Sequence, residues 1–461
     1  MFILNPVSVI NSMENDKHEE HLNFAEEANN MDGTVIHWGG AVIGLILAIV
    51  LIFKKVNPVY ALFGGAVIGG LLGGASIDLT VQYIIEGTNS VMGAVVRVLA
   101  AGVLAGILIE SGAAERIAET IVAKLGEKKA LLSIALATMI ITAVGVFITV
   151  AIIIVAPIAL SVGKKIGISK TALLLALVGG GKAGNIISPN PNTIAVAKGF
   201  DVDLAQVMIN GFIPAVAGLI VTVLVAKMLT NKGVMVSDTD QVDDGASKKE
   251  KPSFGRSMVA PIVAIVLLAL NPIGSILDIE ALKAFKIDSM IILPVAGIIG
   301  LIAMKQTKHI ITFTTSGLNK MTGTAIILIG AGAIAGIISK SNLSAVVVDT
   351  IEVMGVSGTF LAPLAGILMG AATASTSTAS IVAAGSFGEA ILSMGTAPLS
   401  AAVMVHTGAT VIDHLPHGNF FHVTAESVKM SIKERMKLIP YESIVGLTMA
   451  IVATILYGFI F

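Results

Sequence analysis

The stretch GVLAGILIESG, residues 102–112, recurs 230 residues later in the chain as GAIAGIISKSN, residues 332–342. The match extends without a gap over residues 60–112 and 290–342. Identical pairs include Gly102/Gly332, Ala105/Ala335, Ser111/Ser341, Asn89/Asn319 and, at an offset of 227, Pro189/Pro416 and Asn192/Asn419. Chance similarity between two helices rich in Gly and Ala does not account for the paired polar residues. The sequence therefore predicts an internal duplication.

The composition identifies the solvent of this chain as a lipid bilayer. Of the 461 residues, 55% are hydrophobic and only 13% are charged, and the mean hydropathy is +0.91. A soluble protein of this size could not cover so much apolar surface with so few charges. Apolar runs around residues 42–53, 262–270 and 444–461 are long enough to belong to helices that cross about 30 Å of hydrocarbon. The chain is predicted to be a multi-pass protein of the bacterial inner membrane.

The same composition and the absent motifs exclude several other classes of protein. Lys and Arg number 29 against 30 Asp and Glu, so no basic excess exists to bind nucleic acid. The chain has no cysteine and therefore no disulfide, thiolate metal site or cysteine nucleophile. It also has no P-loop, GxSxG or HExxH motif. These absences argue against an ATPase and an intramembrane hydrolase, and the prediction is that the chain is not an enzyme.

Lysine and arginine positions orient the two halves, because short cytoplasmic loops carry an excess of these residues. They place both chain ends outside and predict crossings that include residues 90–110, 206–228 and 320–339. The apolar stretches 130–163 and 358–393 must each begin and end on one face, so each is a helical hairpin. Five crossings in each half turn the second half upside down, which is the architecture of secondary transporters.

The predicted fold class is thus an all-α polytopic membrane protein built from two inverted-topology repeats. Each repeat has about five spans, one helical hairpin and one broken helix. The polar stretch between the repeats is expected to be a solvated linker in the cytoplasm. The divisions are a polar tail (1–35), a first membrane repeat (36–230), the linker (231–256) and an inverted second repeat (257–461).

Two segments break the rule that lipid-facing backbone must be satisfied within a continuous helix. Val178–Thr193, VGGGKAGNIISPNPNT, contains three consecutive glycines and two prolines, and Met404–His422 is interrupted by Pro416 and Gly418. Polar side chains at that depth need partners. In the first segment these are Asn185, Ser188, Asn190, Asn192 and Thr193, and in the second Asp413, His414, His417 and Asn419.

The hairpins supply further polar groups. The second contains AATASTSTAS, residues 371–380, with six hydroxyl side chains in eight positions, and the first contains Thr149 in an apolar run. Hydroxyls often bond to helical carbonyls in membranes, but that role accounts for only one or two of them. A broken-helix tip whose N–H groups and hydroxyls bind an oxyanion or a cation fits better. The hydroxyls at its centre are Ser375, Thr376, Ser377 and Thr378.

Lys182 and a histidine cluster are the remaining candidates. An ionised lysine in an apolar segment is expensive, so Lys182 is either the counter-ion of a substrate carboxylate or a side chain that reaches the cytoplasmic face. Four of the eight histidines lie between 406 and 422. They suit a proton relay or substrate donors better than a zinc site, because histidine titrates near neutral pH.

The order of these motifs resembles the gluconate permease (GntP) family of the ion transporter superfamily. The resemblance rests on residues 102–130, the first hairpin, ISPNPNTIAVAKGFDVDLAQV (187–207) and HTGATVIDHLPHGNFF (406–421), and it covers most of residues 36–461. It implies cation-coupled uptake of gluconate-like sugar acids or small hydroxy acids by a homodimer with elevator motion. Thr149 stands where the family usually has an acid, and the paired Asn192 and Thr193 resemble sodium-coupled carboxylate transporters.

The sequence as a whole predicts a secondary active transporter that imports small organic anions together with H⁺ or Na⁺. The alternatives are an Na⁺/H⁺ antiporter, for which Asp413 would be the intramembrane acid, and a channel. No cofactor is expected besides the coupling ion. The expected partners are the anion, the lipid bilayer and a second copy of the chain. The candidate binding residues are Thr149, Lys182, Asn185, Ser188, Asn190, Asn192, Thr193, Ser375, Thr376, Ser377, Thr378, Asp413, His414, His417 and Asn419.

Overall fold

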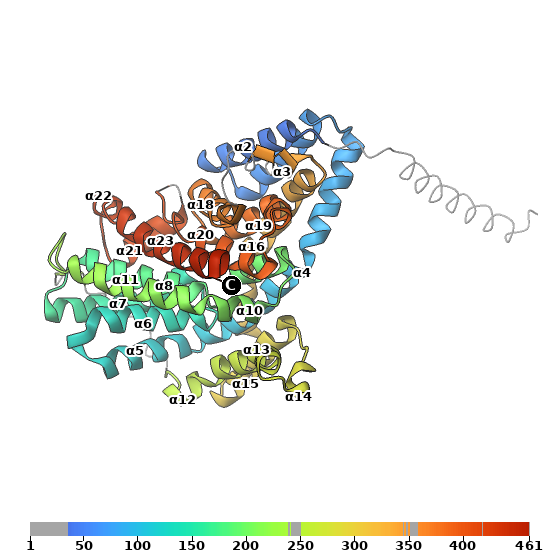
Figure 1. The fold of residues 1–461 in the computed structure, drawn as a ribbon. Helices are drawn as coiled ribbons and strands as arrows, with labels where there is room; N and C mark the ends of the chain where they lie inside the picture. The colour runs from blue at the N-terminus through green and yellow to red at the C-terminus, as the bar shows by residue number, and fades with distance from the viewer. Residues whose placement is uncertain are drawn as a thin grey trace, which may run out of the picture.

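The computed structural model is built from helices, which pack into one elongated body (Figure 1). It describes residues 36–237, 240, 250–343, 345–346, 349–350, 358–416 and 418–460. The predicted tail, most of the middle of the linker, and His417 therefore lie outside the described residues. Within the described ranges, β-structure is limited to two isolated bridges, Ile36 with Ser341 and Ser169 with Met235.

The first half of the chain contains a helical hairpin, α6 and α7, followed by a helix broken between α8 and α9. Asn57 and Ser76 cap α3 and α4 through their side chains, which fixes where these helices begin. Its main helices are α2 (Trp38–Phe53), α3 (Pro58–Leu72), α4 (Ile77–Glu110), α5 (Ala113–Leu125), α6 (Ala130–Ala143), α7 (Ile148–Ile166), α8 (Lys170–Asn185), α9 (Pro191–Gly199), α10 (Leu204–Asn210) and α11 (Phe212–Met228).

The second half repeats this order with α18 and α19 as the hairpin and α20 and α21 as the broken helix. The second hairpin helix starts at 148 and 376, the broken helix at 170 and 398, and its second part at 191 and 419. The offset is 228 residues each time. The helices are α12 (Phe254–Ser257), α13 (Val259–Leu277), α14 (Glu280–Lys283), α15 (Ser289–Ala303), α16 (Ile310–Ser339), α18 (Leu361–Thr373), α19 (Thr376–Ser393), α20 (Pro398–Ala409), α21 (Asn419–Ser427), α22 (Ile432–Met436) and α23 (Ile439–Ile455).

Helices α4 and α16 pack against each other in antiparallel directions through glycines. A Cβ atom built on Gly87 would lie 2.2 Å from the carbonyl oxygen of Gly332, and one on Gly317 would lie 2.0 Å from that of Gly102. No side chain larger than hydrogen fits at either crossing, and this lets the two backbones touch. The two long helices are thereby fixed as the centre of the scaffold.

Both long helices exceed the predicted crossings 90–110 and 320–339. They begin at Ile77 and Ile310, and α4 with 34 residues is about 51 Å long, well beyond the hydrocarbon thickness. The prediction followed the apolar windows, and polar residues such as Gln82 and Glu86 lower the hydropathy of the first turns. The predicted crossing 206–228 is also different, because α10 and α11 meet at a bend of 42° at Gly211.

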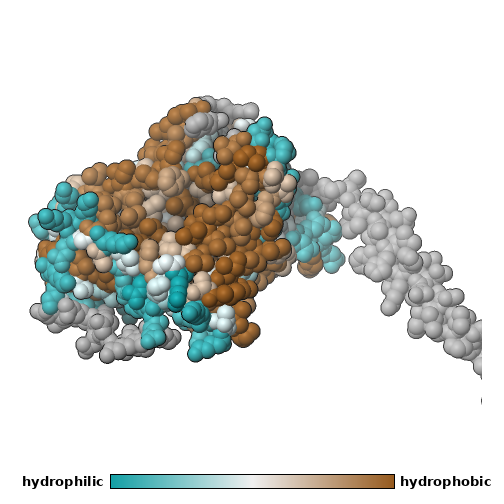
Figure 2. Space-filling view, turned by 90° about the horizontal axis from the view of Figure 1, so that it is seen from below, coloured by the Kyte–Doolittle hydropathy of each residue, from teal (hydrophilic) through white to brown (hydrophobic). Residues whose placement is uncertain are grey.

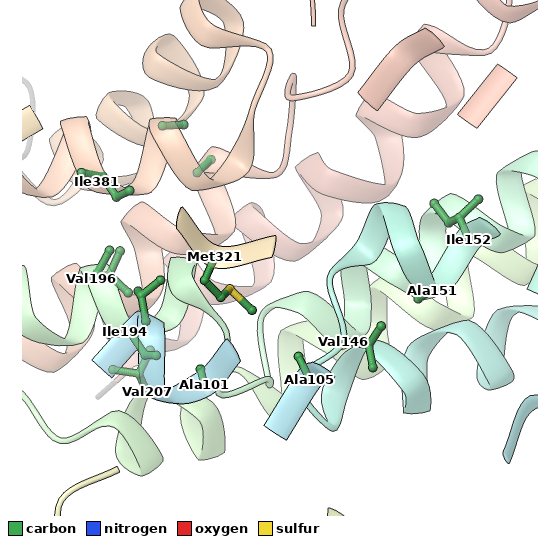
Figure 3. Close-up of a cluster of buried hydrophobic side chains, with 14 of the residues drawn as sticks. Ala101, Ala105, Val146, Ala151, Ile152, Ile194, Val196, Val207, Met321 and Ile381 are labelled. Atoms are coloured by element: carbon green, nitrogen blue, oxygen red, sulfur yellow. The ribbon is translucent and has the colours of Figure 1, made fainter. Parts of the chain in front are cut away.

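The helices form two groups (Figure 1). In the first, α2 packs on α3, α3 on α16, and α15 on both α4 and α13. In the second, the hairpins pack on α8 and α20, and α11 packs on α23. Apolar side chains such as Ala101, Ala105, Val146 and Met321, all buried, lie where the first hairpin loop and α9 approach α4 and α16 (Figure 3).

The outer surface is suited to lipid. Five described helices are long and apolar enough to cross a membrane, and the bent pair α10–α11 is a sixth candidate. Figure 2 shows apolar side chains over much of one face, with hydrophilic residues gathered along one edge. The chain is an all-helical protein with several apolar spans.

The linker differs from the expectation of a solvated stretch, because both of its described ends are docked. Asp240 forms an ion pair with Lys170 at the start of α8, with 2.7 Å between the two atoms. Lys251 binds Glu115 and Glu119 of α5 at 2.5 and 2.6 Å. Composition alone made these charges look solvated, since their partners are distant in sequence.

Candidate functional site

A cleft of about 570 Å³ lies where the two hairpin turns meet the two helix breaks. It is bordered on one side by the loop between α2 and α3, residues 55–58. Hydroxyl and amide side chains dominate the lining. The polar lining residues are Asn57, Thr149, Asn185, Asn192, Thr373, Ser375, Thr376, Ser377, Thr378, Asp413, Asn419 and His422.

Four helices begin at this cleft, and each presents its N-terminal end to it. The side chain of Asn190 accepts hydrogen bonds from the first backbone N–H groups of α9, and Ser375 caps α19 in the same way. No side chain caps α7 after Phe147 or α21 after Gly418. The first N–H groups of a helix carry about half a positive charge in total and lack partners within the helix. The uncapped ends of α7 and α21 are therefore suited to an anionic group.

Amide side chains from the first helix break form one side of the cleft. Asn190 Nδ2 donates to Asn185 Oδ1 at 2.6 Å, and Asn192 Nδ2 donates to the same oxygen at 3.0 Å. Ser377 from the second hairpin donates to Asn192 Oδ1 at 2.5 Å, so the hairpin turn is tied to the break. Among the described residues, Asn185 Nδ2 is buried without a partner. A buried donor of this kind is costly until a ligand oxygen satisfies it.

A buried ion pair lies directly behind the cleft. Lys182 Nζ is 2.7 Å from Asp413 Oδ1, and Lys182 is fully buried. Its two other donors go to the carbonyl oxygen of Thr410 at 2.5 Å and to His414 Nδ1 at 2.9 Å. The opposite carboxylate oxygen of Asp413 accepts from the hydroxyl of Thr376 at the hairpin turn. An ammonium has three donors, and all three of Lys182 are used inside the protein.

The polar cluster continues away from the cleft to the start of α23. His414 Nε2 is 3.0 Å from the carbonyl oxygen of Ile439 and 3.8 Å from Glu442 Oε2. Glu442 and Arg435 form a two-bond ion pair at 2.6 and 2.9 Å, and both side chains are fully buried. The guanidinium of Arg435 also stacks on the ring of Phe421, 4.9 Å from its centre.

The structure divides the predicted residues into three sets. Lys182 and His414 are buried behind the cleft with Ser188, Asn190 and Thr193, and His417 is outside the described residues. Thus Lys182 faces Asp413 and not the cleft, and neither of the two roles considered from the sequence describes its contacts. The residues in contact with the cleft are Thr149, Asn185, Asn192, Ser375, Thr376, Ser377, Thr378, Asp413 and Asn419.

Sequence reasoning missed Arg435 and Glu442. Arg435 was counted only among the charges that orient the chain, and Glu442 near the start of the last apolar run was passed over. The available signal was an acid at the beginning of a membrane span, where an unpaired charge is costly. The spacing of seven residues places the pair across the turn between α22 and α23.

The family model of the GntP family permeases matches residues 36–460 of this chain. The chain belongs to the GntP permease family. A GntP permease is a transporter and not an enzyme, and with its apolar spans this one is a multi-pass protein of the bacterial cell membrane.

Relatives of this GntP permease are transporters. It is 52% identical to a Haemophilus influenzae protein named "Uncharacterized transporter", over 91% of this chain and 97% of that one. It is 24% identical to a high-affinity gluconate transporter of Escherichia coli, over 89% and 96% of the two chains. It is 26% identical to the Gnt-II system L-idonate transporter of the same organism, over 50% of this chain and 53% of that one.

Solved structures of two transporters share the fold of this GntP permease. The Alcanivorax borkumensis YdaH transporter matches with a TM-score of 0.61 over 83% of this chain and 89% of that chain, at 14% identity. Neisseria gonorrhoeae MtrF also gives 0.61, over 82% and 84%, at 15% identity. At this identity the likeness extends to the fold alone.

Proposed function

We propose that this permease is a secondary active transporter that imports small organic anions, such as gluconate-like sugar acids or hydroxycarboxylates, together with H⁺ or Na⁺. One observation carries the proposal: four helix N-termini and a ring of hydroxyl and amide side chains meet in one cleft. The names of its gluconate and L-idonate relatives support the same class of substrate.

The chemistry of the cleft fits a polyhydroxy acid. A carboxylate is stabilised by the uncapped ends of α7 and α21, where backbone N–H groups lack side-chain partners. Hydroxyl groups of the substrate match the hydroxyls of the second hairpin and the unpartnered Asn185 Nδ2. The volume of about 570 Å³ is within the usual range for a small-molecule site.

Two inverted repeats would provide the alternating access that such a transporter needs. The repeat is supported by the equal helix order and by the crossing of α4 and α16. Gly87 contacts Gly332 and Gly336, while its partner in the sequence alignment, Gly317, contacts Gly102 and Gly106. This reciprocal pattern is expected of two helices related by a two-fold axis, and equivalent helices run antiparallel only when one repeat is inverted.

The group of hairpins and broken helices would then move as the transport domain against the scaffold of α4 and α16. The cleft borders the loop at Lys55, which the lysine and arginine distribution assigns to the cytoplasm, so this conformation is open inward. A homodimer through the scaffold is part of the same proposal, because a fixed scaffold is needed for elevator motion.

A binding screen tests the proposed substrate class. Thermal unfolding of the purified protein is measured with gluconate, other sugar acids and short hydroxycarboxylates, with and without Na⁺. Gluconate-like acids should raise the unfolding temperature of the wild-type protein, because a ligand that binds only the folded state stabilises it. Ser377→Ala should reduce this shift, whereas Ser393→Ala at the far end of α19 should not.

The alternatives give different results. A shift with Na⁺ or pH but with no carboxylate would favour the Na⁺/H⁺ antiporter. Equal shifts for Ser377→Ala and wild type across all acids would remove the second hairpin from the site.

A further inference from the structure

Five buried ionisable side chains form a continuous cluster from the cleft to the start of α23. Asp413 touches the cleft, Lys182 and His414 lie behind it, and Glu442 and Arg435 follow. All five are at most 3% exposed. Charged groups face His414 from three sides: Lys182 on α8, Asp413 beside it, and Glu442 on α23, whose own partner Arg435 is on α22.

The charges of this cluster balance only when His414 is neutral. Lys182 neutralises Asp413 at 2.7 Å, and Arg435 neutralises Glu442 at 2.6 Å. A protonated His414 would add one uncompensated positive charge in a region without solvent. Such a charge is strongly disfavoured inside a protein unless another charge appears beside it.

The hydrogen bonds agree with the neutral form. His414 Nε2 donates to the carbonyl oxygen of Ile439, and Nδ1 accepts from the ammonium of Lys182. The same Nδ1 lies 3.1 Å from Asp413 Oδ1, with no hydrogen available between them in this tautomer. A proton on Nδ1 would convert that contact into a charge-assisted hydrogen bond without any large movement. Lys182 would keep its bonds to Thr410 and Asp413.

An anion bound in the cleft changes the balance by one negative charge. Because Thr376 and Asp413 belong both to the cleft and to the cluster, the bound carboxylate lies close to this network. Imidazole is the side chain that most readily changes its charge near neutral pH, so a proton on His414 is the least costly compensation. We propose that His414 takes up one proton when the anion binds and releases it when the anion leaves.

This inference rests on the proposed function, which it makes specific in two respects. The coupling ion is H⁺, held on His414 and taken from the compartment that supplies the anion. Transport of a monovalent acid is electroneutral, because the negative charge of the anion and the positive charge of the proton move together. The energy for accumulation then comes from the pH difference alone.

Calorimetry of gluconate binding tests proton uptake directly. The binding heat of the wild-type protein is measured at pH 7.5 in buffers with different ionisation enthalpies, which gives the number of protons bound per gluconate. The expected value is about one for wild type and about zero for His414→Gln. His309→Gln, which alters a histidine outside this cluster, should keep the wild-type value. A wild-type value near zero, or proton uptake that persists in His414→Gln, would overturn the inference.

Proteoliposomes supply the second readout. An outside pH one unit more acidic should give about tenfold accumulation of gluconate by wild type, and a membrane potential alone should give none. His414→Gln should still exchange external for internal gluconate but should not accumulate it. Accumulation driven by potential alone would contradict electroneutral coupling, and this wild-type measurement decides the matter even if His414→Gln does not insert. If wild type neither binds nor transports any carboxylate, the proposed function itself fails, which is a different result from carboxylate uptake without proton uptake.

Discussion

Replacing Asp413 should destabilise the protein because it isolates a buried ammonium. In Asp413→Leu, the fully buried Lys182 keeps only the Thr410 carbonyl and His414 as partners. Removing one partner of a buried ion pair typically lowers the free energy of unfolding by about 3–5 kcal/mol. Lys182→Met should have an effect of similar size, since it leaves the carboxylate unpaired.

The double variant Lys182→Met/Asp413→Leu distinguishes a loss of charge pairing from a loss of packing. Replacing both charges with apolar side chains of similar volume is often neutral or stabilising, so the double variant should be more stable than either single variant. The coupling energy from the double-mutant cycle should be about 3 kcal/mol. Lys165→Met, at a side chain that is 65% exposed, serves as the control and should change stability little.

The assay is reversible unfolding in mixed micelles, followed by circular dichroism, with the same conditions for all variants. If Lys182 instead served as a free binding charge, Lys182→Met would leave stability unchanged and would weaken only anion binding. Additive losses in the double variant, or single losses below about 1 kcal/mol, would refute the buried ion pair as the source of stability.

Three further changes test other parts of the structure. Ser377→Ala should weaken gluconate binding about 5- to 150-fold, measured by calorimetry, because it removes one buried hydrogen bond. Gly317→Leu should abolish the folded yield judged by size-exclusion chromatography, whereas Gly323→Leu should be tolerated, since a Cβ there meets nothing within 4 Å. Burial opposes ionisation of Asp240, but Lys170 and the neighbouring hydrogen bonds prevail and keep its pKa below the ordinary value. The pair therefore stabilises the protein above about pH 4, and this contribution is lost as the pH falls through the lowered pKa, so Asp240→Asn should lower unfolding free energy at pH 7 by about 1.5–3 kcal/mol and should flatten its pH dependence in acid.

The elements that the sequence predicts well are those with a local physical signature. Three glycines at 179–181 and the prolines after Ser188 break the helical pattern in the same way in any context, and the structure breaks the helix at Ile186–Asn190. The duplicated glycines of residues 102–106 and 332–336 indicated close helix packing, and they lie at the crossing of α4 and α16. The hydroxyl-rich run of the second hairpin lies at its turn.

Features that depend on partners distant in sequence could not be predicted. Lys182 looked like a counter-ion for substrate because Asp413 lies 231 residues further along the chain, and no pattern within either segment joins them. The docking of Asp240 on Lys170 was missed for the same reason. Glu442 offered a signal of its own, but its pairing with Arg435 becomes evident only once both are known to be buried.

Uptake into proteoliposomes that contain the purified protein shows whether this permease accumulates a small organic anion through the hairpin cleft. Labelled gluconate or a related sugar acid is supplied with an inward H⁺ or Na⁺ gradient. We expect saturable uptake above the external concentration, which disappears when the gradient is collapsed and is weakened by Ser377→Ala. Uptake that only equilibrates, without saturation and independently of both gradients, would contradict secondary active transport by this protein.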